Sequence, residues 1–280
     1  MIITSSSNSR IKLLRQLIRE GQADSENRIP IEGIKLVQEA LKSDLPIEAL
    51  YIAQDKLKEV SIRDILRQLK RHRPEVTLVS DRVFDSMVDT ENPQGIVALV
   101  RLPQARWGDV IGNSPLVLVA CQLQDPGNLG TVFRSAEAFG VKTVLLTQNT
   151  VSPMNQKVIR ASAGSLFRIH HLSGLEPEKL IGDLDRLGFK LIAATSRGDK
   201  DFRQADYRGP TALFVGNEGR GFPDVILDRI PLKVRIPLAP KVESLNVAIA
   251  SSIILCEAAR QRFVPDAEWG MRSAEQEGPG

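Results

Sequence analysis

The sequence LFVGNEGRG occupies residues 213–221 and carries the pattern that decides the fold. Its first three residues, Leu213 to Val215, predict a strand buried on both faces, as in a parallel sheet covered by helices. The loop that follows has three glycines in six residues, which permits positive φ values and a close approach of the backbone to a ligand. The glycine order differs from the dinucleotide fingerprint G-x-G-x-x-G, and no Gly-Lys-Ser/Thr follows as in a P-loop. A tight turn rarely needs three glycines around an Asn-Glu pair, so we interpret this stretch as a binding loop.

The surrounding sequence alternates strands with helices, which predicts a parallel sheet covered on both sides. Gly140 and Gly188 stand where two of the helices are expected to end. Ligands of such sheets bind beyond the carboxyl ends of the strands, so the loops there are the candidate site. The expected strands are residues 116–120, 141–146, 191–194, 213–215 and 234–236, and the expected helices are residues 129–139, 176–187 and 243–262.

The first third of the chain predicts a smaller α/β domain, residues 1–102. Periodicity is lost around Pro103 and Gly108, so residues 103–110 are expected to form a linker to a second domain, residues 111–264. The polar end, residues 265–280, is expected to be disordered. Within the first domain the expected helices are residues 10–20, 34–41 and 62–69, and the expected strands are residues 29–33, 49–52, 76–79 and 96–100.

Two further loops carry polar residues at the expected carboxyl edge of the sheet. In the first, Asn128 is a natural helix N-cap, and Arg134 can reach back toward whatever lies at the start of the helix. Taken alone, this pattern is better explained as a capped helix with a solvated arginine. In the second, residues 236–246, a strand passes through two prolines to the last helix. N-capping by Ser244 accounts for one polar residue and leaves Asn246 unexplained.

Composition bounds the class of protein more than its function. The chain has 280 residues, 42% hydrophobic and 25% charged, which is typical of a soluble protein with a buried core. No apolar run reaches the ~20 residues of a membrane span, and no signal peptide pattern is present. Cys121 and Cys256 lie in apolar segments, which indicates reduced core residues and a cytoplasmic protein. With two cysteines and three histidines, no zinc-like spacing exists, so no metal is expected.

The net charge of +3 permits a nucleic-acid partner and decides little. Basic residues cluster near the N-terminus, at Arg10, Lys12, Arg15 and Arg19. Such a cluster fits a solvated helix face and a surface that follows a phosphate backbone equally well.

The three loops together resemble the motifs of the SpoU (TrmH-like) family of RNA ribose 2′-O-methyltransferases, within the SPOUT superfamily. Residues 128–134 match its first motif, N-x-G-x-x-x-R; residues 213–221 resemble its second and residues 236–247 its third. Residues 8–12 and 31–37 resemble the substrate-binding domain of many members. The third motif usually reads I-P-M-x-G, whereas Leu238 and Pro240 stand at its Met and Gly positions, and Pro240 removes a backbone N–H.

The resemblance implies a trefoil-knotted domain that binds S-adenosylmethionine and acts on RNA as a homodimer. Arg134, Asn128 and Glu218 are the implied catalytic residues, and Arg10 and Lys12 the implied RNA contacts. In family accounts the counterpart of Arg134 is the base; because arginine stays protonated, we favour a role in holding phosphate and oxyanion, with Glu218 orienting Arg134 or accepting the proton. The implied cofactor contacts are Thr195, Gly216, Asn217, Gly219, Ile236, Leu238, Ser244, Leu245 and Asn246.

Ribosomal RNA is the substrate favoured by the resemblance of the first domain, with transfer RNA as the alternative. A non-catalytic RNA-binding protein on the same scaffold is the competing class. The presence of Asn128, Arg134, Glu218, Ser244 and Asn246 argues against it.

Overall fold

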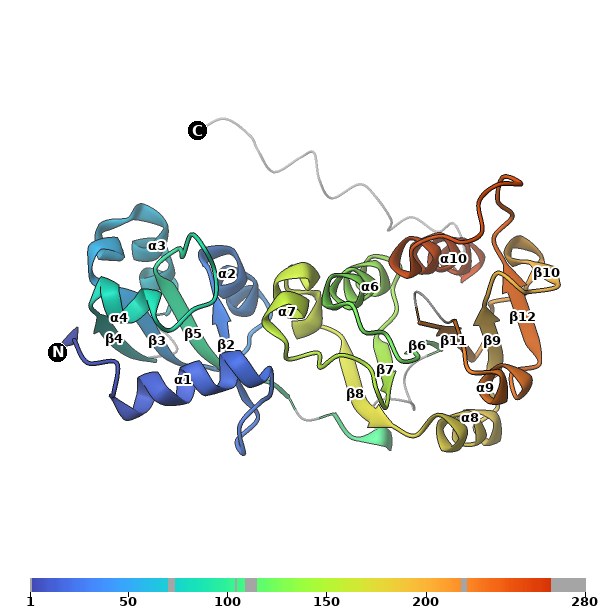
Figure 1. Ribbon diagram of the computed structural model, residues 1–280, viewed down its shortest axis with the longest axis horizontal. Coiled ribbons are helices and arrows are strands. Elements are labelled where there is room, and N and C mark those ends of the chain that lie inside the picture. Colours follow the sequence, from blue (N-terminus) through green and yellow to red (C-terminus); the bar gives the residue numbers. More distant parts are fainter. Residues whose placement is uncertain (1, 70–73, 104, 109–114, 218–220, 263–280) are drawn as a thin grey trace.

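The computed structural model describes residues 2–69, 74–103, 105–108, 115–217 and 221–262. Two sheets follow each other along the chain, each covered by helices on both faces (Figure 1). The predicted fold class, a parallel α/β domain preceded by a smaller α/β domain, is confirmed. The boundaries 1–102, 103–110 and 111–264 and the trefoil knot stay predictions, and residues 265–280 lie outside the described residues.

The N-terminal sheet has the strand order β1-β4-β3-β5-β2. Strand β5 is antiparallel to both β2 and β3, and the remaining pairs are parallel. Helices α2 and α3 pack on one face, while α1 and α4 pack on the other. The elements are β1 (Ile2–Ile3), α1 (Ser9–Glu20), β2 (Arg28–Glu32), α2 (Ile34–Lys42), β3 (Ile47–Ala53), α3 (Val60–Gln68), β4 (Glu75–Val79), α4 (Asp81–Asp85) and β5 (Ile96–Arg101).

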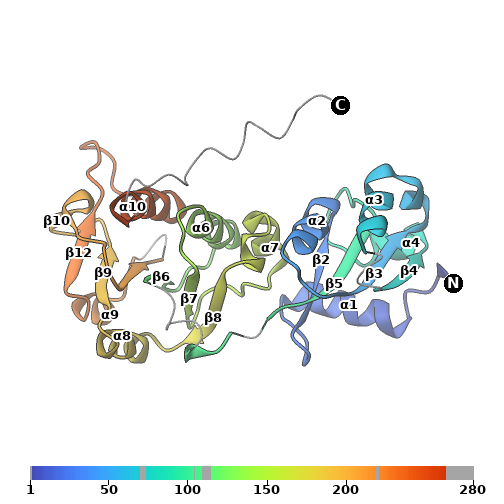
Figure 2. The same ribbon diagram turned by 180° about the vertical axis from the view of Figure 1, so that it is seen from behind.

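The C-terminal sheet has seven strands in the order β10-β12-β9-β11-β6-β7-β8, and every pair is parallel. Helices α6, α7 and α10 cover one face and α8 and α9 the other, as the views from front and back show (Figures 1 and 2). The elements are β6 (Leu116–Ala120), α6 (Pro126–Ala138), β7 (Thr143–Thr147), α7 (Gln156–Ser162), a 3-10 turn (Ser165–Phe167), β8 (His170–Leu175), α8 (Pro177–Arg186), β9 (Lys190–Ala194), β10 (Lys200–Asp201), β11 (Thr211–Val215), α9 (Asp224–Asp228), β12 (Leu232–Arg235) and α10 (Val247–Arg262).

Alternation along the central strands explains the three layers. In β6, Leu118 and Ala120 face α6 and α10, whereas Val117 and Val119 face α8 and α9. All five residues of β6 and of β11 are buried, as the continuous apolar runs predict.

Several predictions about the elements were incomplete or wrong. Strand β8 and helix α7 were not predicted. His170 and His171 give this edge strand no apolar alternation, and the seven residues of α7 are too few for a helical pattern. Cys121 is buried, and its burial raises the pKa of its thiol to about 12, but Cys256 is exposed. The prediction that Cys256 is a core residue is therefore wrong, since it lies on the outer side of α10.

Candidate active site

The register of the sheet brings the ends of four strands into one row. Val215 of β11 lies opposite Ala120 of β6 on one side and Ala194 of β9 on the other, and Ala194 lies opposite Val234 of β12. The loops after these strands therefore leave the sheet at the same level of one edge. This is where parallel α/β sheets bind ligands.

A cavity of about 310 Å³ lies at this edge. Its walls come from the segments after β9, β11 and β12 and from the first turns of α10. Apolar side chains form much of the lining, with polar groups from the loops among them. The lining residues are Ala194, Thr195, Ser196, Arg197, Val215, Gly216, Asn217, Gly221, Phe222, Val234, Ile236, Leu238, Glu243, Ser244, Leu245, Val247, Ala250 and Ile254.

Gly216 is required by close contacts within the glycine-rich loop. A Cβ on Gly216 would lie 3.0 Å from both the Gly221 carbonyl carbon and Cδ2 of Phe222. Asn217 and Gly221 exchange two backbone hydrogen bonds of 3.1 and 3.0 Å, which close the loop. The side-chain amide of Asn217 also donates to the backbone carbonyl of Gln122, at 2.9 Å. This bond connects the loop to the segment after β6. Glu218 and Gly219 lie outside the described residues.

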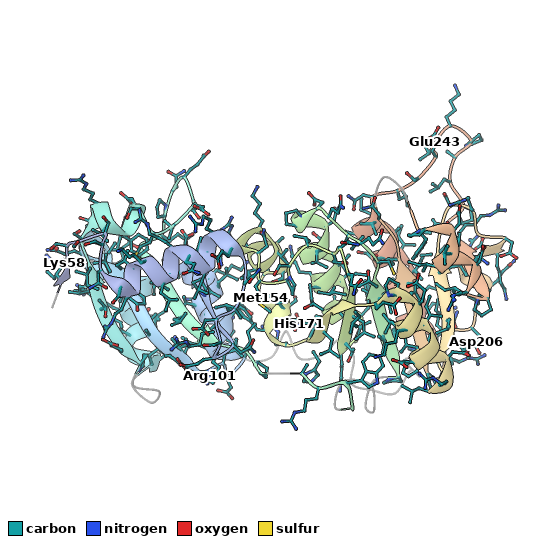
Figure 3. The ribbon with its side chains drawn as sticks, turned by 60° about the horizontal axis from the view of Figure 1, so that its bottom comes forward. Lys58, Arg101, Met154, His171, Asp206 and Glu243 are labelled. Atoms are coloured by element: carbon teal, nitrogen blue, oxygen red, sulfur yellow. The ribbon has the colours of Figure 1, made fainter. Side chains whose placement is uncertain are left out.

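The loop of residues 236–246 projects from the sheet and carries Glu243 near its tip (Figure 3). Ile236 and Leu238 line the cavity at the start of this loop, and Ser244 and Leu245 line it near the end. Pro240 is exposed and is not among the described residues that line the cavity. The replacement of glycine by proline therefore falls at a solvent-facing part of the loop.

Both helices next to the cavity are capped differently from the prediction. Helix α6 begins at Pro126, and its N-cap is Asp125, whose carboxylate accepts from the Asn128 backbone N–H at 2.7 Å. Asn128 is therefore not the N-cap. Proline is favoured at the first helical position, and Pro126 starts the helix three residues before the predicted start at residue 129. Helix α10 begins at Val247, and Asn246, not Ser244, accepts from the backbone N–H groups of Ala248 and Ile249.

The side chains of Asn246 and Asn128 also contact each other. The Asn246 amide Nδ2 donates to Oδ1 of Asn128 at 2.8 Å. The bond joins the third loop to the first turn of α6. Asn246 itself is not among the described residues that line the cavity, so its place is at the join between the two loops.

Arg134 lies on α6, six residues after Asn128, or about 9 Å along the helix axis. Its side chain is exposed, and no hydrogen bond or ion pair joins it to another residue within the described part of the chain. The neighbouring Ser135 bonds Ser252 of α10 through their hydroxyls at 2.6 Å, so α6 and α10 are held together beside Arg134. Among the described residues, the guanidinium is therefore placed to meet an anionic ligand.

The two predicted RNA contacts lie on α1 and differ in their partners. Arg10 forms an ion pair with Glu75, and this contact raises the pKa of Arg10. Lys12 is exposed. Lys12 is therefore better placed than Arg10 to meet a phosphate.

Analysis of the sequence missed several residues that line the cavity. Ser196 and Arg197 directly follow Thr195 at the end of β9, and Glu243 lies within the third loop, so their positions at a strand end were a usable signal. Phe222, Val247, Ala250 and Ile254 show only core-like sequence patterns, and their place in the cavity comes from the packing of α10 on the sheet.

The chain matches two family models in consecutive parts. Residues 115–256 match the model described as the SpoU rRNA Methylase family. The chain belongs to the SpoU rRNA methylase family. Residues 30–105 match the model described as RNA 2′-O ribose methyltransferase substrate binding. The match to the family model contains every strand of the C-terminal sheet and the whole lining of the cavity.

Relatives of the family resemble the chain over nearly its whole length. An uncharacterized tRNA/rRNA methyltransferase of Synechocystis is 36% identical over 264 residues, which cover 93% of this chain and 94% of the relative. The 23S rRNA (guanosine(2553)-2′-O)-methyltransferase RlmP of Bacillus subtilis is 30% identical, covering 90% of this chain and 97% of the relative. The crystal structure of an AdoMet-bound rRNA methyltransferase from Sinorhizobium meliloti has a TM-score of 0.81 and 28% identity, covering 94% of this chain and 99% of that chain.

Within the described residues, no helix has both the length and the apolar character needed to cross a membrane. The same residues hold no group of three or more His, Cys, Asp or Glu side chains arranged to bind a metal ion.

Proposed function

We propose that this protein transfers a methyl group from S-adenosylmethionine to a ribose 2′-hydroxyl of ribosomal RNA. The observation that carries the proposal is the joined site: the cavity at the carboxyl ends of β9, β11 and β12 is linked through Asn246 and Asn128 to the helix that presents Arg134. The family relationship supports the same reaction.

The residues of the cavity fit S-adenosylmethionine. Val215, Ile236 and Leu238 offer apolar surface for an adenine ring and a thioether. Thr195 and Ser244 offer hydroxyl groups to a ribose, while backbone groups near Gly216 can approach a ligand because no side chain intervenes. A triphosphate would need several cations, whereas Arg197 is the one cationic side chain among the described lining residues.

When bound, S-adenosylmethionine supplies a methyl group on a positively charged sulfur. The attack is an in-line displacement, so the chain contributes mainly by orienting the ribose against the cavity. The 2′-hydroxyl loses its proton as the new O–C bond forms. Arg134, as a fixed positive charge, holds the neighbouring phosphate and stabilises the developing negative charge on the oxygen. Glu218 is proposed as the group that orients Arg134 or accepts the proton.

We propose that the substrate is ribosomal rather than transfer RNA. The Bacillus relative is named for a guanosine of 23S rRNA, and a Ralstonia relative at 27% identity is also named as a 23S rRNA methyltransferase. The experiment is a map of 2′-O-methylated nucleotides in all RNA from a strain lacking this protein, together with transfer of tritiated methyl groups to that RNA by purified protein. A missing methyl group in transfer RNA alone would replace the proposed substrate, and RNA binding without cofactor binding would favour the non-catalytic class.

We also propose a cytoplasmic homodimer. Ile249 is 53% exposed on the first turn of α10, and Ile253 and Cys256 follow at spacings of four and three residues on the same side. An exposed apolar stripe of this kind beside the site is typical of a surface that a second copy covers. The location in the cytoplasm follows from the proposed RNA substrate.

A further inference from the structure

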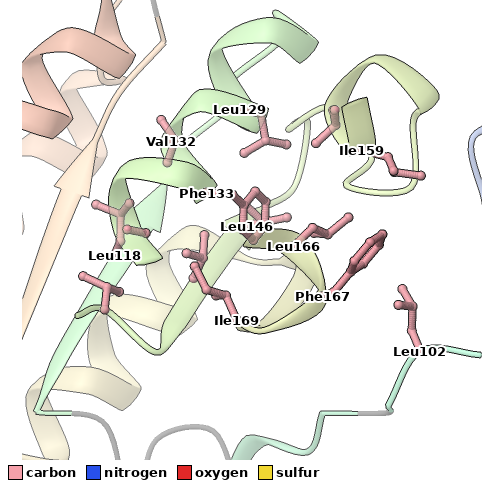
Figure 4. Packing of buried hydrophobic residues seen from close by; sticks show 14 of the residues in the cluster. Leu102, Leu118, Leu129, Val132, Phe133, Leu146, Ile159, Leu166, Phe167 and Ile169 are labelled. Carbon is pink, nitrogen blue, oxygen red and sulfur yellow. The ribbon is translucent and has the colours of Figure 1, made fainter. Parts of the chain in front are cut away.

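The two sheet domains share a continuous hydrophobic core. Ile31 and Val37 of the N-terminal domain and Ile159 and Phe167 of the C-terminal domain belong to one cluster of buried residues. Leu102, from the connecting segment, is buried in the same cluster and lies beside Phe167, where both line a cavity of about 40 Å³ (Figure 4).

Polar contacts also cross this junction. The Gln156 side chain, 6% exposed, donates to the carbonyl of Pro30 at 3.0 Å, and the Ser152 hydroxyl donates to the carbonyl of Gly21 at 2.6 Å. A Cβ on Gly21 would lie 3.1 Å from Cα of Asn155, so the end of α1 abuts the start of α7. A buried amide that loses its hydrogen-bond partner is unfavourable, so these contacts hold one relative orientation.

Arg168 connects the two domains to the helix that carries Arg134. Its Nε and Nη2 atoms both donate to the carboxylate of Glu137 on α6. Its Nη1 atom donates across the junction to Glu39 and to the Ser43 hydroxyl, each at 3.0 Å. Glu137 follows Arg134 by three residues on α6, which is almost one helical turn.

The junction is tight where these residues meet. A Cβ on Gly164 would lie 2.7 Å from Cβ of Glu39, so α2 packs directly on the turn after α7. Helix α7 in turn packs on α6 at Gly130, where a Cβ would lie 2.5 Å from Cβ of Ala161. The Arg168 bridge and the packing of these helices therefore both resist a displacement of the N-terminal domain relative to the site.

We infer that Arg168, held between Glu137 and the Glu39–Ser43 end of α2, is a positioning residue that sets where RNA bound by the N-terminal domain presents its ribose to Arg134. This inference rests on the function proposed above. The domains act as one rigid body, and the fixed separation selects the nucleotide. Misplacement of a reacting group by about 1 Å costs up to about a hundredfold in rate, so a modest change of orientation has a measurable effect.

The first test uses the double variant Glu39→Gln with Ser43→Ala, which removes the negative charge and the hydroxyl that Arg168 contacts at the end of α2 and leaves the Arg168–Glu137 pair intact. We expect kcat/KM to fall about tenfold on full-length ribosomal RNA and to change less than twofold on a short fragment carrying the same nucleotide, with cofactor affinity unchanged. The matched control is Lys42→Gln, which removes the other partner of Glu39 at a 71% exposed position. Equal losses on both RNAs, or no loss on either, would overturn the inference.

The second test measures the rate of a cross-link, which does not depend on activity, and then the activity of the cross-linked protein. The pair Gly21→Cys and Asn155→Cys, in a Cys256→Ser background, places two Cβ atoms about 3.6 Å apart, which suits a disulfide. We expect rapid and complete cross-linking, a slower reaction when Glu39→Gln and Ser43→Ala are added, and retained methylation of full-length RNA after cross-linking. Each single cysteine variant controls for strain at Gly21 and for the lost cap at Asn155.

The outcomes separate the two proposals. A wild-type protein that methylates no ribose removes the proposed function, and the cross-linking rate still decides whether the junction is rigid. A slow cross-link, or a cross-linked enzyme whose activity returns only on reduction, would show that the domains must move and would overturn the inference.

Discussion

Asn246 and Asn128 are 118 residues apart in the sequence and share a hydrogen bond of 2.8 Å between their side-chain amides. Asn246 also caps α10 through its Oδ1 atom, so one side chain starts a helix and ties it to α6. The cavity proposed to bind the cofactor and the helix that carries Arg134 are joined at this point.

We expect Asn246→Ala to destabilise the fold by about 1 kcal/mol through loss of the cap and to lower methylation by more than tenfold. The matched control is Glu176→Ala, because the Glu176 side chain caps α8 on the opposite face of the sheet, away from the cavity. A double-mutant cycle with Asn128→Ala, measured by urea unfolding and by methyl transfer, reports the coupling between the two side chains. Additive effects in both measurements would mean that the bond does not join the loops functionally.

Arg134→Lys should lower the methyl-transfer rate about a hundredfold or more, because lysine keeps the charge but not the forked geometry that holds a phosphate. The affinity for S-adenosylmethionine, measured by calorimetry, should stay unchanged. Arg186→Lys, at an exposed position on α8, is the control. A collapse of cofactor affinity in Arg134→Lys would make the residue structural instead.

Gly216→Ala should weaken cofactor binding at least tenfold, because its Cβ would press on Gly221 and Phe222 at 3.0 Å. Gly182→Ala is the matched control: Gly182 lies inside α8 with nothing within 4 Å of its Cβ position. That change should stabilise the protein by up to about 1 kcal/mol and leave binding intact. Thermal unfolding and calorimetry distinguish the two variants, and equal binding by both would contradict the role of Gly216.

Stability should fall in acid partly through Glu137. Its hydrogen bond with Arg168 holds the pKa of the Glu137 carboxyl below its ordinary value of 4.5. The folded state thus favours the ionised form, so this stabilisation is complete above about pH 4.5 and is lost as pH falls through the lowered pKa. Because both side chains are about a third exposed, Glu137→Gln should cost no more than about 1 kcal/mol at neutral pH.

In Glu137→Gln, the free energy of unfolding should fall less steeply as the pH is lowered below about 4.5. Urea unfolding across that pH range measures the slope. Asp64→Asn, which removes an exposed pair on α3, serves as the control. An unchanged slope in Glu137→Gln would show that other carboxylates carry the effect.

Ile249→Asp should convert a dimer into a monomer, because it places a charge on the exposed apolar stripe of α10. Val225→Asp is the control, since Val225 is similarly exposed, at 61%, on α9 at the opposite face of the sheet. Sedimentation velocity reads the mass of each variant. A monomeric wild-type protein would remove the proposal of a dimer.

The sequence by itself determined the elements whose signal is local. The apolar runs of β6 and β11 predicted buried parallel strands, and the glycine-rich loop after Val215 predicted a ligand site at the end of a strand. Thr195, Ile236, Leu238 and Ser244 follow strands or precede a helix, so their positions were visible in the pattern and they do line the cavity.

Tertiary structure alone decided how these local parts meet. Whether Ser244 or Asn246 caps α10 depends on where the helix begins, and Asn246 is held at that point by its bond to Asn128 of α6. The bond between Asn246 and Asn128 and the bond between Arg168 and Glu39 each join residues more than a hundred positions apart, and periodicity reports only on neighbours within a few turns. The hydrophobic pattern of the sequence specifies which face of a helix or strand is buried, whereas the register of the sheet specifies which strand ends lie next to each other.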